Sequence, residues 1–254
     1  MLRARVIPCL LLRNGGLVKT LRFGEAKYVG DPINAVKIFN EKEVDELVVF
    51  DIEASKRGTD PNYDLLADIA TECFMPVCYG GGVSSVEQAL RLVQLGIEKI
   101  AVNASAISNP GLVAALSEVL GAQSVVAGID VKNDWLGRPR VYDASSGKLT
   151  NRTPEAWAET LARAGAGEIF LNSVDRDGAQ EGYDLKLIGK VAKAVSVPII
   201  ACGGAGRVED FASAVAAGAS AVAAGSLFVF QGRHRAVLIS YPPYKELERL
   251  LGTK

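Results

Sequence analysis

A carboxylate and an alkyl side chain stand at equivalent ends of two apolar runs in this 254-residue chain. Asp130 follows the run 125–129, and Leu11 follows the run 5–10. A positioned aspartate can act as a general acid or base, whereas leucine neither donates nor accepts a proton. The sequence therefore predicts a proton-transferring group at Asp130 and argues against a reaction that needs a second acid at Leu11.

Two glycine-rich loops provide a different kind of chemistry. Gly80-Gly81-Gly82 and Gly203-Gly204 each follow an apolar run and precede an amphipathic segment. Backbone N–H groups in such loops, together with the next helix N-terminus, favour anions. We expect two facing phosphate sites for an elongated ligand, with ordinary tight turns as the alternative. The predicted phosphate- or substrate-binding residues are Asp51, Gly81, Gly82, Asn103, Ala104, Asp177, Gly178, Gly203, Gly204, Gly225 and Ser226.

Four charged residues begin predicted strands, namely Arg5, Glu46, Lys99 and Glu168. Since residues two apart in a strand share a face, Arg5 points the same way as Leu11. Two positive and two negative side chains that point inward must pair, because a buried unpaired charge is costly. The pattern predicts an ionic ring across one end of a barrel. Solvated charges on the rim are the alternative.

The order of elements predicts a fold. Short β-branched runs alternate with amphipathic segments about eight times, as in a parallel barrel. We expect strands at 6–12, 46–51, 76–79, 99–102, 125–131, 168–172, 198–202 and 221–224. We expect helices at 32–43, 63–73, 86–95, 110–120, 154–164, 185–195, 208–217 and 244–251. Residues 75–82 resemble residues 197–204, as a half-chain repeat requires. The prediction is one (β/α)8 TIM barrel domain over 1–254 with a half-barrel internal repeat.

Composition and net charge argue against several classes of partner and site. The net charge of −1 gives no case for nucleic acid or an anionic membrane, and no apolar stretch is long enough to span a bilayer. The four cysteines lack CxxC spacing, which indicates reduced thiols. The single histidine, His234, rules out a multi-histidine metal site, and its basic surroundings do not suggest a Ser/His/Asp triad. We expect a soluble, cytoplasmic protein without a metal or other cofactor.

The motifs together resemble the cyclase subunit of imidazole glycerol phosphate synthase, over almost the whole chain. The resemblance rests on residues 7–10, 15–19, 30–32, 45–47, 80–82, 103, 129–130, 175–178, 182–184 and 203–206. It implies that ammonia from a glutaminase, docked at the N-terminal face, passes through a gate formed by the four charged residues. A substrate with two phosphates is then attacked between two aspartates. Lys19 lies in the family's mobile loop, which closes over the substrate.

The chain departs from the family where the chemistry is performed. One of the two aspartates is Asp130, but the other position holds Leu11. Cys78, Asn172 and Cys202 stand where the family usually has small hydroxyl residues. Losing a positioned acid or base typically costs about 10² to 10⁴-fold in rate. We therefore expect a changed ligand and doubt ordinary cyclase activity.

Other stretches resemble a divergent branch of the family, linked to acetamidino groups on bacterial surface sugars. These are residues 10–20, 28–34, 39–47 and 72–76. That branch implies a synthase-like subunit that conducts ammonia for amidination of a nucleotide-linked sugar in lipopolysaccharide O-antigen biosynthesis, with a third, ATP-using amidotransferase.

Two alternatives remain. One is a histidine-pathway cyclase whose second acid has moved to Asp51, Asp175 or Asp177. The other is a non-catalytic scaffold that docks partners and conducts ammonia.

Overall fold

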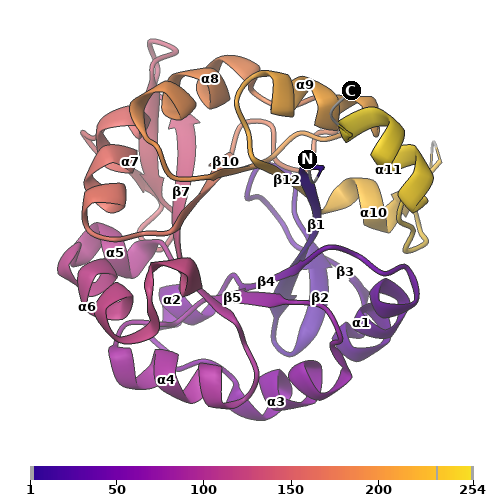
Figure 1. The fold of residues 1–254 in the computed structure, drawn as a ribbon, viewed down its shortest axis with the longest axis horizontal. Coiled ribbons are helices and arrows are strands. Elements are labelled where there is room, and N and C mark those ends of the chain that lie inside the picture. Colours follow the sequence, from indigo (N-terminus) through magenta and orange to yellow (C-terminus); the bar gives the residue numbers. More distant parts are fainter. Residues whose placement is uncertain (1–2, 233, 253–254) are drawn as a thin grey trace.

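The computed structural model describes residues 3–232 and 234–252 as a closed parallel barrel surrounded by helices (Figure 1). Around the barrel, the strands follow the order β10-β11-β12-β1-β4-β5-β6-β7, and pairing of β10 with β7 closes the ring. Their bounds are β1 (Arg5–Arg13), β4 (Leu47–Asp51), β5 (Val77–Gly80), β6 (Lys99–Val102), β7 (Val125–Asn133), β10 (Glu168–Ser173), β11 (Ile199–Cys202) and β12 (Ala221–Ala224). The predicted (β/α)8 TIM barrel is confirmed.

The outer helices follow the predicted order, and their ends differ from the predicted ones by at most two residues. They are α1 (Pro32–Glu41), α3 (Tyr63–Glu72), α4 (Val86–Gln94), α6 (Gly111–Leu120), α7 (Pro154–Arg163), α8 (Leu185–Ala194), α9 (Glu209–Ala216) and α11 (Tyr244–Leu251). Asp31 and Thr153 each accept a backbone N–H in the first turn of their helix, as residues before an N1 proline commonly do. Asn109-Pro110 behaves differently, because Pro110 itself is the cap and no side chain caps α6.

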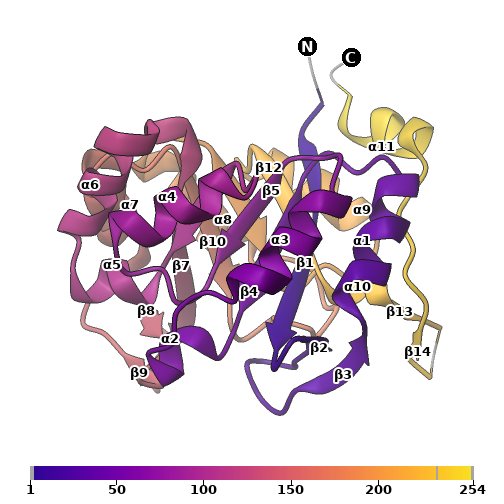
Figure 2. The same ribbon diagram turned by 90° about the horizontal axis from the view of Figure 1, so that it is seen from below.

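Several short elements were not predicted. They are β2 (Gly16–Lys19), β3 (Lys27–Gly30), α2 (Ala54–Arg57), α5 (Ala104–Ser108), η1 (Ala122–Ser124), β8 (Pro139–Asp143), β9 (Lys148–Leu149), α10 (Ser226–Val229), β13 (Phe230–Gln231) and β14 (Ala236–Val237). Figure 2 shows β2, β3, α2, β8 and β9 beyond the carboxyl ends of the barrel strands. Four-residue strands are too short to give a clear alternation in the sequence. β2, β3, α2, β8 and β9 therefore extend the wall of the barrel beyond the carboxyl ends of its strands.

Two apolar clusters hold the barrel together. The larger one lies between strands and helices and includes Phe39, Tyr79 and Phe211. The smaller one fills the barrel interior with Ile7, Cys9, Val48, Cys78, Ala101, Val126, Phe170, Ile200, Ala221 and Ala223. Interior side chains alternate with outward ones along each strand. As a result, this apolar layer lies directly above the strand-start residues on the same inward faces.

Among the described residues, none forms a helix long and apolar enough to cross a bilayer.

Candidate functional site

The four strand-start charges form a closed ionic ring at the amino ends of the strands. Arg5 pairs with Glu46 and Glu168, and Lys99 Nζ lies 2.9 Å from Glu46 Oε2 and 2.8 Å from Glu168 Oε2. Glu46 and Glu168 are buried. Each cation therefore touches both anions, and the four side chains pair as the strand parity indicates. They do not behave as independent solvated charges on the rim.

The two glutamates of the ring compensate for the burial of its two cations. Burial disfavours the charge on Arg5, but Glu46 and Glu168 outweigh that cost and hold the Arg5 pKa above its usual value. Burial opposes the charge on Lys99 in the same way, and hydrogen bonds to both glutamates raise the Lys99 pKa overall. Both cations of the ring are therefore held in their charged forms by the two glutamates that they contact.

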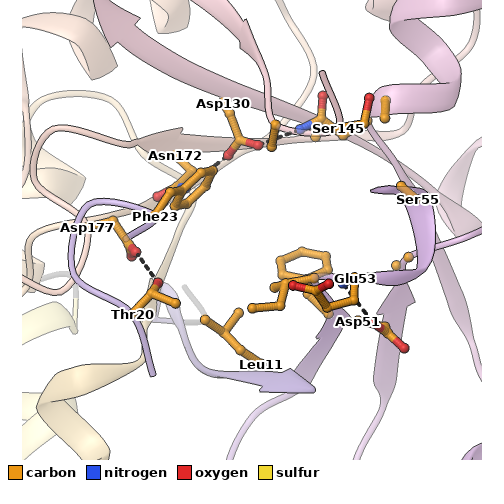
Figure 3. Close-up of a pocket in the computed structure, with 18 of the residues that line it drawn as sticks. Leu11, Thr20, Phe23, Asp51, Glu53, Ser55, Asp130, Ser145, Asn172 and Asp177 are labelled. Atoms are coloured by element: carbon orange, nitrogen blue, oxygen red, sulfur yellow. Dashed lines mark hydrogen bonds between the residues drawn. The ribbon is translucent and has the colours of Figure 1, made fainter. Parts of the chain in front are cut away.

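At the carboxyl ends of the strands, a pocket of about 560 Å³ opens into the barrel (Figure 3). Of the predicted site residues, the following line it: Leu11, Asp51, Gly81, Asn103, Ala104, Asp130 and Asp177. Residues that were not predicted as ligands also contribute, among them Arg13, Phe50, Glu53, Ser55, Ser145 and Asn172. Most of these come from the unpredicted short elements or from strand positions that only barrel closure brings together.

Asp130 is a half-buried acid in the wall of this pocket. Asn103 Nδ2 donates to Asp130 Oδ2 at 2.7 Å, and Asn172 Nδ2 donates to Asp130 Oδ1 at 2.9 Å. Burial raises the Asp130 pKa to about 7, against the lowering effect of these two hydrogen bonds; the nearby Asp177 and Asp143 carboxylates add to the rise. A carboxyl group with such a pKa can both hold and release a proton at neutral pH.

Leu11 lies across the pocket from Asp130 (Figure 3). It packs against the interior apolar layer, together with Phe50 and Cys202. The wall facing Asp130 at this point is thus hydrocarbon. The geometry places no carboxylate at the position where the resemblance implies the second acid.

The three candidate replacement acids occupy different environments. Asp51 Oδ1 accepts the backbone N–H groups of Glu53 and Ala54, and so holds the turn into α2. Asp175 Oδ2 accepts the Asn133 N–H instead, and it does not line the pocket. Asp177 lines the pocket, and burial raises its pKa. Asp177 is therefore the one of the three with the environment of a proton-transfer group.

The first glycine loop opens into the pocket. Gly81 has a φ of +124°, and a Cβ there would lie 2.5 Å from Asp51 O, so that only glycine fits. Gly82 N–H already donates to Ser55 Oγ at 3.2 Å. Ala104 is the first residue of α5, which follows the neighbouring strand β6. Gly81 and Ala104, both predicted to bind phosphate, thus line the same pocket.

Lys19 occupies the space beside Gly225, one of the residues predicted to bind the second phosphate. Its ammonium group is buried and donates to Cys9 O at 2.5 Å, and a side chain at Gly225 would overlap Lys19 Nζ. Burial lowers the Lys19 pKa. Gly178 packs against the backbone of Thr20, the residue that follows Lys19. The predicted ligand residues absent from the pocket wall are Gly82, Gly178, Gly203, Gly204, Gly225 and Ser226.

The pocket thiols form a pair. Cys202 lies within hydrogen-bonding reach of Cys9, and this contact lowers the Cys9 pKa, while the Cys202 pKa is raised. Cys78 belongs to the interior apolar layer, and burial raises its pKa. His234 is exposed, as its basic surroundings suggest. Within residues 3–232 and 234–252, no cluster of three or more His, Cys, Asp or Glu side chains is arranged to hold a metal ion.

Comparison with known proteins identifies the family. Residues 5–235 match the histidine biosynthesis protein family. The chain is 52% identical to the "Putative imidazole glycerol phosphate synthase subunit hisF2" of Pseudomonas aeruginosa, over 98% of this chain and 99% of that protein. It is 47% identical to the similarly named hisF3 of Vibrio vulnificus, over 99% and 97% of the two chains. The "Imidazole glycerol phosphate synthase subunit HisF" of Alkaliphilus metalliredigens is 39% identical, over 90% and 91%. The chain therefore belongs to the histidine biosynthesis protein family, among its HisF-type imidazole glycerol phosphate synthase subunits.

Proposed function

We propose that this chain is the ammonia-conducting, synthase-like subunit of a cytoplasmic glutamine amidotransferase complex. The observation that carries the proposal is the combination of a complete ionic ring at one end of the barrel with Leu11 facing Asp130 at the other. The entrance retains its chemistry, whereas the two-acid site at the exit is reduced to one acid.

The barrel interior supports a route for a small neutral molecule. A charged ring at the floor is followed by an apolar layer and then by the polar mouth. Neutral ammonia can enter an apolar layer, whereas an ion would bear a large desolvation cost there. In this proposal Arg5, Glu46, Lys99 and Glu168 are the gate residues. A glutaminase subunit docks on the surrounding N-terminal face.

Sugar amidination is the reaction we assign to the complex. Identity is 47–52% to relatives whose names begin with "Putative", such as hisF2 and hisF3, but 39–42% to relatives named HisF subunits without that word. This difference supports a specialised branch, as does Leu11. We propose that the ammonia serves amidination of the N-acetyl group of a nucleotide-linked sugar for lipopolysaccharide O-antigen, through a third, ATP-using amidotransferase. Reconstitution of the three proteins with glutamine, ATP and such a sugar is the direct test, and no amidine product would contradict the assignment.

Histidine-pathway cyclisation is the second candidate, because Asp177 lies in the same pocket with a raised pKa. It predicts that Asp177 replaces the missing acid opposite Asp130. A cyclase assay with added ammonium salt separates the two candidates without any partner protein. Our proposal predicts no turnover of the two-phosphate substrate at ordinary enzyme rates of about 1 to 10³ s⁻¹.

Leu11→Asp is expected to increase that cyclase rate by about 100-fold over the unmodified protein. The substitution returns an acid or base to the position across the pocket from Asp130, and such a group typically contributes about 10² to 10⁴-fold. Leu11→Asn is the matched control, because it adds polarity without a titrating group. If the unmodified protein cyclises at ordinary rates and Asp177→Asn abolishes the activity, the histidine-pathway reading replaces ours.

Phe74→Ser is expected to weaken binding of the glutaminase subunit by about 30-fold. Phe74 is 91% exposed beside the amino end of β5, and its N–H donates to Asn40 Oδ1 at 3.1 Å, which anchors the loop. A presented aromatic side chain of this kind is a typical interface anchor, and truncating it costs about 2 kcal/mol or more. Calorimetric titration with the glutaminase gives the affinity.

Trp135→Ser is the matched control for Phe74. Trp135 is 89% exposed at the tip of the β7–β8 hairpin, on the opposite face of the barrel. Its loss should leave glutaminase affinity unchanged. Equal weakening by both substitutions, or an effect of Trp135→Ser alone, would contradict docking at the N-terminal face.

A further inference from the structure

We propose that Phe50 and Phe170 form an aromatic closure, which separates the pocket from the barrel interior and opens when Phe50 moves. The closure is distinct from the ionic ring at the floor and shares no residue with it. Neither phenylalanine has a part in the proposed function. The inference therefore goes beyond that function and holds whichever reaction the complex performs.

The two aromatic rings meet from opposite walls of the barrel. Phe50 lies on β4 and Phe170 on β10, and these strands are four places apart in either direction around the closed ring of strands. The ring centroids are 5.0 Å apart and the ring planes are inclined by 86°. Such an edge-to-face contact is a favoured arrangement of two aromatic side chains. The pair therefore spans the barrel from one wall to the other.

Glycines on the neighbouring strands make room for the rings. Phe50 is in register with Gly80 on β5, and Phe170 is in register with Gly128 on β7. A Cβ on Gly80 would lie only 2.9 Å from Phe50 Cδ1. The interior of a small barrel is commonly filled by pairing large with small side chains in this way. The aromatic closure is thus built into the barrel strands and not into the loops above them.

The pocket ends at the aromatic closure. Phe50 and Phe170 both line the pocket. Val48 precedes Phe50 by two residues and so shares its inward face, but it is 0% exposed and does not line the pocket. Cys78 on the next strand is likewise 0% exposed and absent from the pocket wall. The two aromatic rings therefore mark the boundary between the pocket and the closed interior.

The aromatic closure and the ionic ring bound one apolar compartment. Phe170 lies two residues beyond Glu168 on β10, so that both side chains point inward. Cys78 is in register with Lys99 and lies just inside the ring. The side chains between the ring and the closure are apolar, and an apolar space disfavours ions. A molecule that passes between the floor and the pocket must cross two closures in series.

Phe50 is the member of the pair that has space to move. It is half-buried and borders a pocket of about 560 Å³, which is large enough to take a phenyl ring. Phe170 is only 4% exposed and is packed within the interior apolar layer. A change of the Phe50 χ1 rotamer towards the pocket separates the two rings. This movement connects the pocket with the compartment below.

The Cys78 thiol reports whether the aromatic closure is open, because it lies in the compartment that the closure seals. The full-length chain is treated with methyl methanethiosulfonate, and labelling of each cysteine is followed by mass spectrometry. Cys202 lines the pocket and should be labelled in every variant. Phe50→Ala is expected to raise the labelling rate of Cys78 by about tenfold or more, because the closed state then loses its ring contact. Phe50→Leu keeps an apolar side chain and should give a smaller increase.

Phe39→Ala is the matched control, since Phe39 is 0% exposed in the outer cluster and does not border the barrel interior. Global unfolding also exposes Cys78, and urea denaturation of each variant gives the unfolded population that this route requires. Labelling of Cys78 should exceed that population in Phe50→Ala but match it in Phe39→Ala. Labelling that follows the unfolded population in all variants, or rapid labelling of Cys78 in the unmodified protein, would overturn the aromatic closure. The experiment uses no glutaminase and no substrate, so its outcome is independent of the proposed function.

Discussion

Replacing Glu46 by leucine is expected to lower the free energy of unfolding by about 3 kcal/mol. Glu46 is 2% exposed, and its Oε2 accepts from both Arg5 and Lys99. The substitution leaves two cations to share Glu168, so that the ring carries a net positive charge at the barrel floor. Breaking a buried ion pair from one side typically costs about 3 to 5 kcal/mol, and partial exposure of Arg5 moves the expectation to the lower end. Urea denaturation measures the loss.

A surface ion pair provides the comparison for Glu46→Leu. Lys37 and Glu72 lie 3.3 Å apart, and both side chains are well exposed. Lys37→Ala should change stability by less than about 1 kcal/mol, because exposed pairs contribute little. If Glu46→Leu is as mild as Lys37→Ala, the four charges act as solvated rim groups, and the gate role proposed for them loses its structural basis.

Asp130→Asn is expected to make the protein more stable than the wild type at pH 8, with a gain that shrinks by about 2 to 3 kcal/mol at pH 5. Burial raises the pKa of Asp130 to about 7 in the folded state, whereas an unfolded aspartate titrates near 3.9. Asparagine has similar shape and no charge. Urea denaturation of both proteins at the two pH values gives the double difference.

The sign follows from proton linkage. Below about pH 4 the carboxyl group is protonated in both states, so that its raised pKa has no effect on stability. Between about pH 4 and pH 7 the unfolded chain has lost the proton while the folded protein retains it, and the stability of the wild type falls as the pH rises. Above pH 7 the penalty is complete. The asparagine variant lacks this fall.

Substitution of an exposed aspartate serves as the control for Asp130→Asn. Asp177 and Asp143 are the charged groups that raise the Asp130 pKa, and they remain in both proteins. Asp64→Asn, on the exposed surface of α3, should show the same pH dependence as the wild type. Identical pH dependence in Asp130→Asn and the wild type would mean that Asp130 is ionised throughout this pH range, and that it does not hold a proton near neutral pH.

Local patterns in the chain were sufficient to predict the barrel and the ionic ring. Strand-to-helix alternation and glycine placement are short-range properties, and they located the eight strands and the outer helices. The ring was predictable because residues two apart share a face: Arg5, Lys99 and Glu168 each begin a strand, and the next inward residue of each strand is apolar. Inward charges in a closed barrel have few partners other than one another.

The short elements over the mouth could not be predicted in the same way. The hairpin of β2 and β3 pairs with β1 through Leu11 and Val18, and its four-residue strands carry no periodic pattern of their own. They are stabilised by the edge that β1 offers beyond the barrel. The same explanation holds for β8, which pairs with the extension of β7.

The sequence by itself determined the barrel, the inward charges at its floor, and the single acid, Asp130, opposite Leu11. Only the tertiary structure decided which of the two predicted glycine loops opens into the pocket, because a near-repeat in sequence implies two similar sites. Lys19 at the end of β2 reaches Cys9 O and occupies the space beside Gly225, where the second site was predicted. The pairing of Asn172 with Asp130 was likewise decided by the closure of β10 against β7. Both contacts join residues far apart in the chain, and their geometry depends on strand register and loop path, which no local pattern encodes.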